Sequence, residues 1–273
     1  MQVVTALFNI NREENDGRTI DEYLSWLHSL LEMFPEAVVF HDGSADRLVL
    51  RFIKAQFIHI NIHELHFFTQ YSAIVKICTR YLDLGKEDLV YLNPQYGIVT
   101  MGKFELMRRA LAYSEDQHFL WVDAGVLRLY KPHLVWTYKN FKNIVTYDFD
   151  GALVEIDLLP RRGRLWPKMP SIGSSDRLIG TSVMLVDRKT IISLDASTTE
   201  MAQHWIDQGE WDTEQVAVAR LWKQGFHFSF CIQEWRAPTS ILRALHDKYS
   251  DLRSFPFLPT GSIIVRIIRW IIN

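Results

Sequence analysis

The sequence predicts an α/β protein with a mixed, mostly parallel central sheet flanked by helices, in a single domain. Three observations support this prediction. The chain opens with an apolar strand pattern, an amphipathic helix pattern and a second strand pattern, and a connection of this kind joins parallel strands. Strand and helix patterns then keep alternating along the 273 residues. Near the middle, a buried-strand pattern stops abruptly at Asp123.

The opening of the chain predicts a strand, a helix and a second strand. Residues 3–10, VVTALFNI, are almost all apolar, as in a buried strand. After a polar loop, Thr19 is expected to cap a helix over residues 20–34, with Glu22 in the capping-box position. Residues 37–43, AVVFHDG, follow as the second strand. This unit is therefore βαβ, and its two strands should be parallel.

The stretch between this unit and the centre of the chain continues the alternation. Residues 47–53 and 57–68 are expected to contain strands, the second because its isoleucines alternate with polar residues. A helix closed by glycine is expected over residues 71–85. Residues 88–103 predict a strand, a turn and the start of a helix that continues over residues 103–113.

The strand at the centre of the chain ends in a carboxylate. Residues 119–122, FLWV, form an apolar run of buried-strand length, and Asp123 stops it. In an open α/β sheet, the carboxyl ends of the strands form the edge where ligands bind. Ala124 and Gly125 carry little or no side chain, so a ligand or metal ion could approach the backbone beside Asp123. The alternative is an aspartate that only caps a turn after the strand.

The second half of the chain adds further strand and helix patterns. Residues 161–176 differ, because they combine four Arg or Lys with prolines, glycines and serines. We expect there a long mobile loop that could cover a phosphorylated substrate, or alternatively an ordinary surface loop. The other expected elements are strand-like pieces over residues 126–136 and 142–160, a strand and a helix joined at Asp187 over residues 177–194, a helix over residues 211–222, a strand over residues 225–235 and a helix over residues 240–255.

Composition and charge exclude several classes of protein. Hydrophobic residues make up 48% of the chain, enough for a core, and the net charge of -2 argues against a protein that mainly coats nucleic acid. Cys78 and Cys231 are too few for a disulfide framework, and HELH at residues 63–66 lacks the metalloprotease spacing. No apolar segment approaches the length of about 20 residues that spans a membrane. The N-terminus predicts a strand and no signal peptide, so we expect a cytoplasmic protein.

The C-terminal tail, residues 260–273, is nearly all apolar except for Arg266 and Arg269, which share a face at helical spacing. The segment from Ile263 to Ile272 could therefore lie on the inner face of the cytoplasmic membrane, with the arginines at anionic headgroups. A partner protein or the chain's own core could cover the same apolar surface. The pattern leaves these alternatives open.

Four residues outside the central strand are candidate ligand contacts. Arg12 follows the first strand and could bind an anion, or could be a solvated loop cation. Lys103 stands in the first turn of a helix, where the helix dipole disfavours a cation, so it is either exposed or present for an anionic ligand. Asp212 and Glu214 begin a late helix, where acidic residues are ordinary capping residues. If that helix points at the ligand edge, one of them could meet an acceptor hydroxyl.

Three of these segments resemble a known family. Residues 3–12, 91–107 and 119–126, which read VVTALFNINR, YLNPQYGIVTMGKFELM and FLWVDAGV, are similar to the HtrL/YibB-like family of bacterial proteins. The likeness extends to the later stretches GTSVMLVDRKTI and WDTEQ. Members of this family are associated with lipopolysaccharide or surface-glycan loci, and they are inferred to resemble glycosyltransferases of the GT-A type. The resemblance therefore implies a GT-A-like domain.

The GT-A fold joins a nucleotide-binding half to an acceptor-binding half. The resemblance accordingly implies a donor half over residues 1–126, an acceptor half over residues 127–260 and a separate tail over residues 261–273. GT-A enzymes carry a metal-binding Asp-x-Asp after a central strand. Asp123 matches the first Asp, whereas Gly125 occupies the second position.

This departure leaves two sources for the positive charge that a diphosphate requires. Mn²⁺ or Mg²⁺ could be held by Asp123 together with the diphosphate, water and a histidine such as His227. Alternatively, Arg12, Lys103 or the cations of residues 161–164 supply the charge without a metal ion.

The function implied by the resemblance is transfer of a sugar from a nucleoside-diphosphate sugar to a glycan or lipid-linked glycan acceptor, as in the synthesis of lipopolysaccharide or capsule. The diphosphate leaves as a dianion, and a carboxylate takes the proton of the acceptor. Asp212 or Glu214 would be this acceptor contact or base. The donor nucleotide would be contacted by Thr5, Arg12, Lys103, Asp123 and Gly125.

Two other functions fit parts of the sequence. A non-catalytic nucleotide- or sugar-binding protein that keeps the fold is supported by Gly125, which replaces the second Asp. A nucleotidyltransferase would normally show a glycine-rich phosphate loop after the first strand, but residues 11–17 contain a single glycine. Turnover of a nucleotide sugar separates an enzyme from a binding protein.

Overall fold

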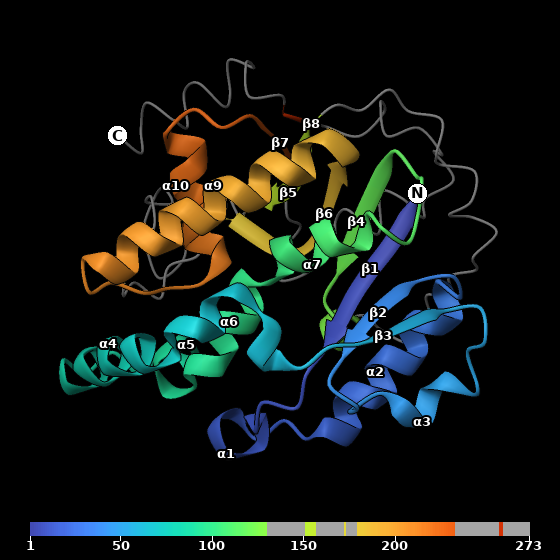
Figure 1. Cartoon of the computed structure of the whole chain (residues 1–273), viewed down its shortest axis with the longest axis horizontal. Helices are drawn as coiled ribbons and strands as arrows, with labels where there is room; N and C mark the ends of the chain where they lie inside the picture. The colour runs from blue at the N-terminus through green and yellow to red at the C-terminus, as the bar shows by residue number, and fades with distance from the viewer. Residues whose placement is uncertain (130–150, 157–171, 173–178, 233–256, 259–273) are drawn as a thin grey trace.

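The computed structural model describes residues 1–129, 151–156, 172, 179–232 and 257–258. Within these residues the strands are β1 (Gln2–Leu7), β2 (Val38–His41), β3 (Gln56–His59), β4 (His118–Val122), β5 (Ala152–Ile156), β6 (Ile179–Asp187), β7 (Phe228–Ile232) and β8 (Phe257–Leu258). They form one sheet in the order β3-β2-β1-β4-β6-β5-β7-β8 (Figure 1). Four of its seven pairings are parallel and three are antiparallel. The predicted fold class is confirmed.

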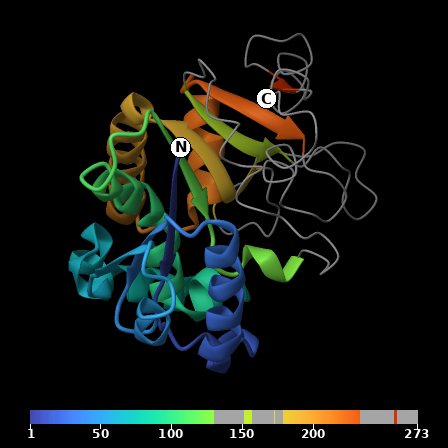
Figure 2. The ribbon, with the colours of Figure 1, turned by 90° about the vertical axis from the view of Figure 1, so that its right-hand side faces the viewer.

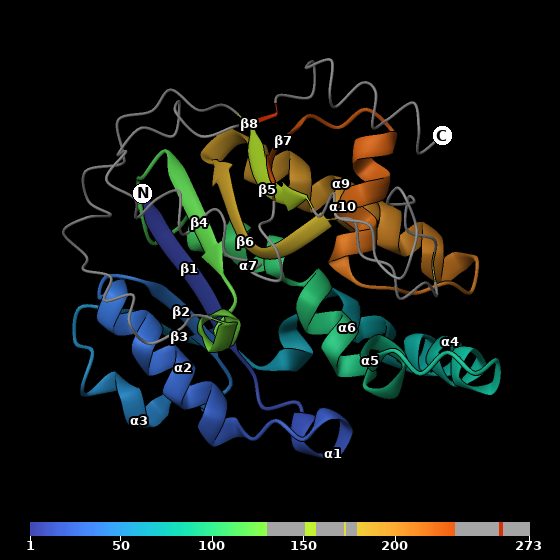
Figure 3. The same ribbon diagram turned by 180° about the vertical axis from the view of Figure 1, so that it is seen from behind.

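Helices cover both faces of this sheet. They are α1 (Arg12–Asp16), α2 (Ile20–Met33), α3 (Asp46–Val49), α4 (Tyr71–Asp83), α5 (Leu89–Leu92), α6 (Pro94–Met101), α7 (Lys103–Ala110), α9 (Arg188–Asp207) and α10 (Glu214–Lys223), with the short 3-10 helices η1 (Ile62–Glu64), η2 (His66–Gln70) and η3 (Val126–Leu129). Figure 2 shows the strands between α9 on one side and α2 on the other. Figure 3, seen from behind, shows α2 in front of β2 and β3 and the green helix η3 at the ends of β1 and β4.

The side chains of β1 and β4 alternate between two cores, as expected for strands buried on both faces. On β1, Val4 packs in the core that includes α4, α7, α9 and α10, whereas Val3 and Leu7 pack in the core that includes α2. On β4, Trp121 belongs to the first core and Val122 to the second. Because both faces are covered, polar groups on these strands can meet a ligand only where the strands end.

The opening βαβ unit forms as the sequence predicts. β1 pairs in parallel with β2 and with β4, so the carboxyl ends of these strands lie at one edge of the sheet. Thr19 caps α2 through a capping box: Glu22 N donates to Thr19 Oγ1 at 3.2 Å, and Thr19 N donates to Glu22 Oε2 at 2.8 Å. Asp123 directly follows β4 at this edge, which confirms that the carboxylate ends a strand.

Two strand predictions are wrong. Residues 47–53 form most of α3 and a following turn, and residues 89–92 form α5. In the first segment the apolar residues share no buried face, since Leu50 is 90% exposed and Ile53 is 85% exposed. The second segment is a single helical turn in which Tyr91 N and Leu92 N both donate to Asp88 O. An apolar run this short does not distinguish a strand from a helical turn.

Several predicted features lie outside the described residues. These are most of residues 130–160, the cationic loop over residues 161–176 apart from residue 172, the helix over residues 240–255 and the C-terminal tail. Among the helices in the described part of the chain, none combines the length and the apolar character needed to cross a membrane.

Candidate functional site

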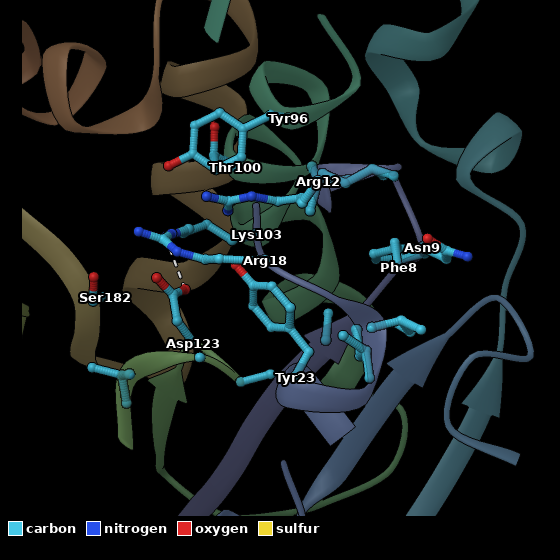
Figure 4. Close-up of a pocket in the computed structure, with 18 of the residues that line it drawn as sticks. Phe8, Asn9, Arg12, Arg18, Tyr23, Tyr96, Thr100, Lys103, Asp123 and Ser182 are labelled. Atoms are coloured by element: carbon cyan, nitrogen blue, oxygen red, sulfur yellow. Dashed lines mark hydrogen bonds and ion pairs between the residues drawn. The ribbon is translucent and has the colours of Figure 1, made fainter. Parts of the chain in front are cut away.

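A cavity of about 670 Å³ opens at the edge of the sheet where β1 and β4 end. This volume lies in the range of pockets that hold small-molecule ligands and cofactors. Its walls come from the segment that leads from β1 through α1 into α2, from α6 and α7, and from the residues that follow β4 (Figure 4). The lining includes four of the predicted site residues, namely Arg12, Lys103, Asp123 and Gly125. The fold therefore brings together residues that are far apart in the sequence.

Asp123 forms the floor of this cavity. Its backbone N donates to Ser182 O at 2.8 Å, which extends the pairing of β4 with β6 past the end of β4. Its Oδ1 accepts hydrogen bonds from Trp121 Nε1 at 2.6 Å and from Lys103 Nζ at 3.2 Å. No donor to Asp123 Oδ2 occurs among the described residues, so this oxygen is available to a ligand.

Lys103 is buried, with 2% of its side chain exposed, although the sequence suggests an exposed cation or one present for a ligand. Its ammonium group donates to Asp123 Oδ1 at 3.2 Å, to Thr181 O at 3.2 Å and to Glu214 Oε1 at 2.8 Å. Burial alone would lower the pKa of Lys103, but the charges of Asp123 and Glu214 outweigh burial and hold this pKa above its usual value. All three N–H groups have acceptors, so none is left for a phosphate.

The two carboxylates predicted to meet an acceptor do not line the cavity. Glu214 lies behind Lys103, and its Oε1 also accepts from Thr181 Oγ1 at 2.5 Å. Burial would raise the pKa of Glu214, but the charge of Lys103 and these hydrogen bonds hold it below its usual value. Asp212 is fully buried, and its Oδ2 accepts from the Tyr91 hydroxyl at 3.3 Å. Neither carboxylate therefore reaches the cavity in this structure, and Glu214 is connected to it through Lys103.

Two arginines share one aspartate on the opposite wall. Arg12 Nη2 donates to Asp16 Oδ2, and Arg18 Nη1 lies 3.2 Å from the same oxygen. The Arg12 guanidinium also lies over the ring of Tyr96 at 4.7 Å and over the ring of Tyr23 at 5.7 Å from the centroids (Figure 4). Burial would lower the pKa of Arg12, but the bond to Asp16 leaves it raised. A guanidinium has five N–H groups, so both arginines keep donors for a ligand.

Arg128, on η3, adds a third guanidinium to the lining. Its Nη1 donates to Gly125 O at 2.6 Å. Burial, followed by the positive charges of Arg18 and Arg12, lowers the pKa of Arg128. A bound anion would offset the repulsion between these like charges. Arg18 and Arg128 were not among the predicted residues, although both follow strands that end at the predicted ligand edge.

The short helix that carries Arg12 stands between two residues in the left-handed backbone conformation, Asn11 at φ 52° and Gly17 at φ 74°. Non-glycine residues adopt this conformation at a cost, and Asn tolerates it better than most. The adjacent chain is fixed by Asn93 Nδ2, which donates to Ile10 O at 2.7 Å. Arg12 stands at the start of this helix and lines the cavity.

Gly125 has a packing reason to be glycine. A Cβ atom at this position would lie 2.8 Å from Tyr23 Cε1 and 2.9 Å from Arg128 Nη1. No aspartate can therefore occupy the second position of an Asp-x-Asp here unless both side chains move. The guanidinium of Arg128 lies next to the place where the second carboxylate would begin.

Thr5 and His227, two further predicted site residues, lie away from the cavity. Thr5 is fully buried within β1 and is not part of the lining. His227 directly precedes β7. Because β6 is antiparallel to β4 and to β5, the strands β4 and β5 run in the same direction, and β7 is parallel to β5. His227 therefore lies at the amino edge of the sheet and Asp123 at the carboxyl edge. The structure thus places the two residues predicted to share a metal ion at opposite edges of the sheet.

The residues around Asp123 do not suit a divalent metal ion. Mg²⁺ and Mn²⁺ need several oxygen or nitrogen ligands. In the described part of the chain, no group of three or more His, Cys, Asp or Glu residues is placed to hold a metal ion. Asp123 is in addition paired with the ammonium group of Lys103. We therefore derive no step of a reaction through a metal ion.

No protein-family model matches the chain, and no curated protein matches it. Among solved structures, the chain is similar to the bifunctional IspDF from Campylobacter jejuni, with 13% identity and a TM-score of 0.41 over 94% of this chain and 54% of that one. The chain thus spans about half the length of that protein.

For two other solved structures, the similarity extends over most of both chains. One is the inositol-1-phosphate CTP transferase from T. maritima, with 10% identity, a TM-score of 0.39, and 92% of this chain and 96% of that one covered. The other is mouse xyloside xylosyltransferase 1, with 10% identity, a TM-score of 0.38, and 85% and 84% covered. Identities and TM-scores are low in all three cases, so the function is inferred from the geometry of the site.

Proposed function

We propose that this protein is a transferase that uses a nucleoside-diphosphate sugar, and more specifically a glycosyltransferase that transfers the sugar to a bacterial surface glycan such as lipopolysaccharide or capsule. The observation that carries the proposal is the cavity at the ends of β1 and β4, which Arg12, Arg18, Arg128 and Asp123 line together. Guanidinium groups bind phosphate oxygens with paired hydrogen bonds, and a carboxylate accepts hydrogen bonds from sugar hydroxyls. The arginines thus suit the diphosphate of such a donor, and Asp123 suits its sugar.

Each group has a role in sugar transfer. The bond between the anomeric carbon and the diphosphate oxygen breaks, and its electron pair stays on the diphosphate, where the three arginines stabilise the charge. The acceptor oxygen forms the new bond to the anomeric carbon, and its proton passes to a carboxylate. We assign Asp123 Oδ2 to a donor hydroxyl. Glu13 and Glu14, which line the cavity, are the candidates for the proton acceptor.

The acceptor class rests on the resemblance to the HtrL/YibB-like family. Two of the segments that carry this resemblance, residues 91–107 and 119–126, supply Tyr96, Lys103 and Asp123 to the cavity. The similar segments thus supply part of the lining, whereas Arg18 and Arg128 lie outside them. A lipid-linked glycan acceptor and a membrane contact through residues 263–272 belong to the same proposal.

The test is release of nucleoside diphosphate from a panel of nucleotide sugars, with and without surface-glycan acceptors. We expect one donor to be turned over, faster when its acceptor is present. Asp123→Asn should lower the rate by roughly tenfold or more, since it removes the charge of a group that accepts two hydrogen bonds and faces the ligand. Asp46→Asn, which changes a side chain that is 72% exposed and belongs to α3, is the matched control.

The alternative is a non-catalytic protein that binds a nucleotide or a sugar. The burial of Asp212 and Glu214 favours it, because neither of the two carboxylates predicted as a base reaches the cavity. Saturable binding of a nucleotide sugar without turnover, in the presence of every acceptor tried, would favour this alternative over the enzyme.

A further inference from the structure

A cation lies beside the place where a metal-binding Asp-x-Asp would carry its second carboxylate. At the second position, the Cβ of any side chain would lie 2.9 Å from Arg128 Nη1, and Gly125 O accepts a hydrogen bond from that same nitrogen. A guanidinium therefore occupies the region into which the second carboxylate would project. A cation at this place repels a divalent metal ion and attracts a phosphate.

The carboxylate at the first position of the motif, Asp123, is already hydrogen-bonded within the protein. Asp123 Oδ1 accepts from Trp121 Nε1 and from Lys103 Nζ, so only one oxygen of this carboxylate is available. Lys103 cannot readily withdraw, because it is buried and held by Glu214 Oε1 at 2.8 Å and by Thr181 O at 3.2 Å. A metal ion at Asp123 would therefore lie next to the buried ammonium group of Lys103 and be repelled by its charge.

Two more guanidiniums face this region from the opposite wall. Arg12 and Arg18 are both tied to Asp16 Oδ2, which fixes their positions while leaving most of their N–H groups unused. Together with Arg128 they come from three different segments, namely α1, the turn before α2, and η3. A diphosphate carries enough oxygens to accept hydrogen bonds from all of them.

We infer that Arg128, with Arg12 and Arg18, holds the diphosphate of the donor in place of a divalent metal ion, so that the protein binds nucleoside diphosphates without one. This inference rests on the proposed function, because it concerns the donor of that reaction. It assigns to Arg128 the role of the principal phosphate contact on the floor of the cavity. It further assigns Asp16 a positioning role for the other two arginines.

The test is calorimetric titration of the full chain with UDP, ADP, GDP and CDP, once in EDTA and once in MnCl₂. We expect at least one of them to bind in EDTA with an affinity that MnCl₂ leaves unchanged. Arg128→Gln should weaken this binding by roughly tenfold or more, because it removes charged hydrogen bonds to the phosphates. Arg18→Gln is a second variant, and Arg51→Gln, an arginine of the turn after α3 with 64% of its side chain exposed, is the control that should bind normally.

Each other outcome has a distinct meaning. Binding that requires MnCl₂ would overturn the inference and leave the proposed function standing. Binding in EDTA that neither arginine variant weakens, with their melting temperatures equal to that of the wild type, would overturn the assignment of the arginines. If none of the four nucleotides binds in either buffer, the proposed function fails, and the inference fails with it.

Discussion

Lys103 Nζ and Asp123 Oδ1 lie 3.2 Å apart on the floor of the cavity, and the lysine is the more deeply buried partner, with 2% of its side chain exposed against 36% for the aspartate. The pair joins α7 to the end of β4, and Glu214 continues it to α10. A buried ammonium group is tolerated only where acceptors surround it, as they do here. The stability of the fold and the position of the ligand-facing carboxylate therefore depend on the same side chains.

Lys103→Met should destabilise the protein by about 3–5 kcal/mol, because Glu214 would remain buried without its counter-ion. The measurement is the free energy of unfolding in urea. Lys54→Met, which changes an exposed lysine, should stay within about 0.5 kcal/mol of the wild type. The double variant Lys103→Met, Glu214→Leu should recover part of the loss, since it removes both charges. A Lys103→Met protein as stable as the wild type would refute this role.

The same variant should reverse the pH dependence of stability. In the wild type the pKa of Glu214 is lowered by folding, so the ionised side chain stabilises the folded protein. This stabilisation is complete above the ordinary pKa of a glutamate and is lost as the pH falls through the lower pKa of the folded state. Wild-type stability should therefore decline below about pH 4.3. Without Lys103, burial should raise the pKa of Glu214, so that stability increases on acidification, by at most about 1.4 kcal/mol per pH unit.

This comparison is made by urea unfolding of both proteins across the acid range. The sign of the slope decides between the two states of Glu214. A Lys103→Met protein that loses stability on acidification just as the wild type does would show that Glu214 is not the group responsible.

Gly125→Ala should destabilise the protein by about 1–3 kcal/mol, since the new methyl group lies 2.8 Å from Tyr23 Cε1 and overpacks the floor of the cavity. It should also weaken nucleotide binding, because Arg128 must move. Tyr23→Leu in the same protein should relieve most of the stability loss. Equal losses in the single and double variants would show that contact with Tyr23 is not the cause.

Thr19→Ala should cost about 1 kcal/mol of stability, because Thr19 accepts a hydrogen bond from Glu22 N and caps α2. Thr79→Ala is the matched control. Thr79 is exposed on α4, and its hydroxyl donates back to Val75 O within the helix, so its loss should be neutral. Equal thermal unfolding curves for the two variants would count against the capping box.

Features set by neighbouring residues could be predicted from the sequence. Thr19 and Glu22 are three positions apart, and their capping box is confirmed. The position of Asp123 after a strand was predicted in the same way, because the apolar run of the strand ends directly before it. The strand predicted over residues 47–53 failed because burial decides between strand and helix for so short a segment, and its Leu50 and Ile53 face solvent.

Errors in the site came from contacts between distant residues. Nothing near Lys103 in the sequence indicates that Glu214, 111 positions later, neutralises it. The position of His227 depends on the direction of β7, which follows only from the pairing of β6 with β4 and β5. Arg18, in the turn before α2, and Arg128, on η3, become site residues because both line the same cavity, and no local pattern predicts that.

The hydrogen bond from Asp123 N to Ser182 O makes the floor of the cavity part of the sheet, whereas the wall that carries Arg12 is a short helix between Asn11 and Gly17. Amide hydrogen exchange should accordingly be slow at Asp123 and fast along α1, which has no buried residue. A ligand therefore meets one side of the cavity that belongs to the central sheet and another that belongs to a short helix without buried residues.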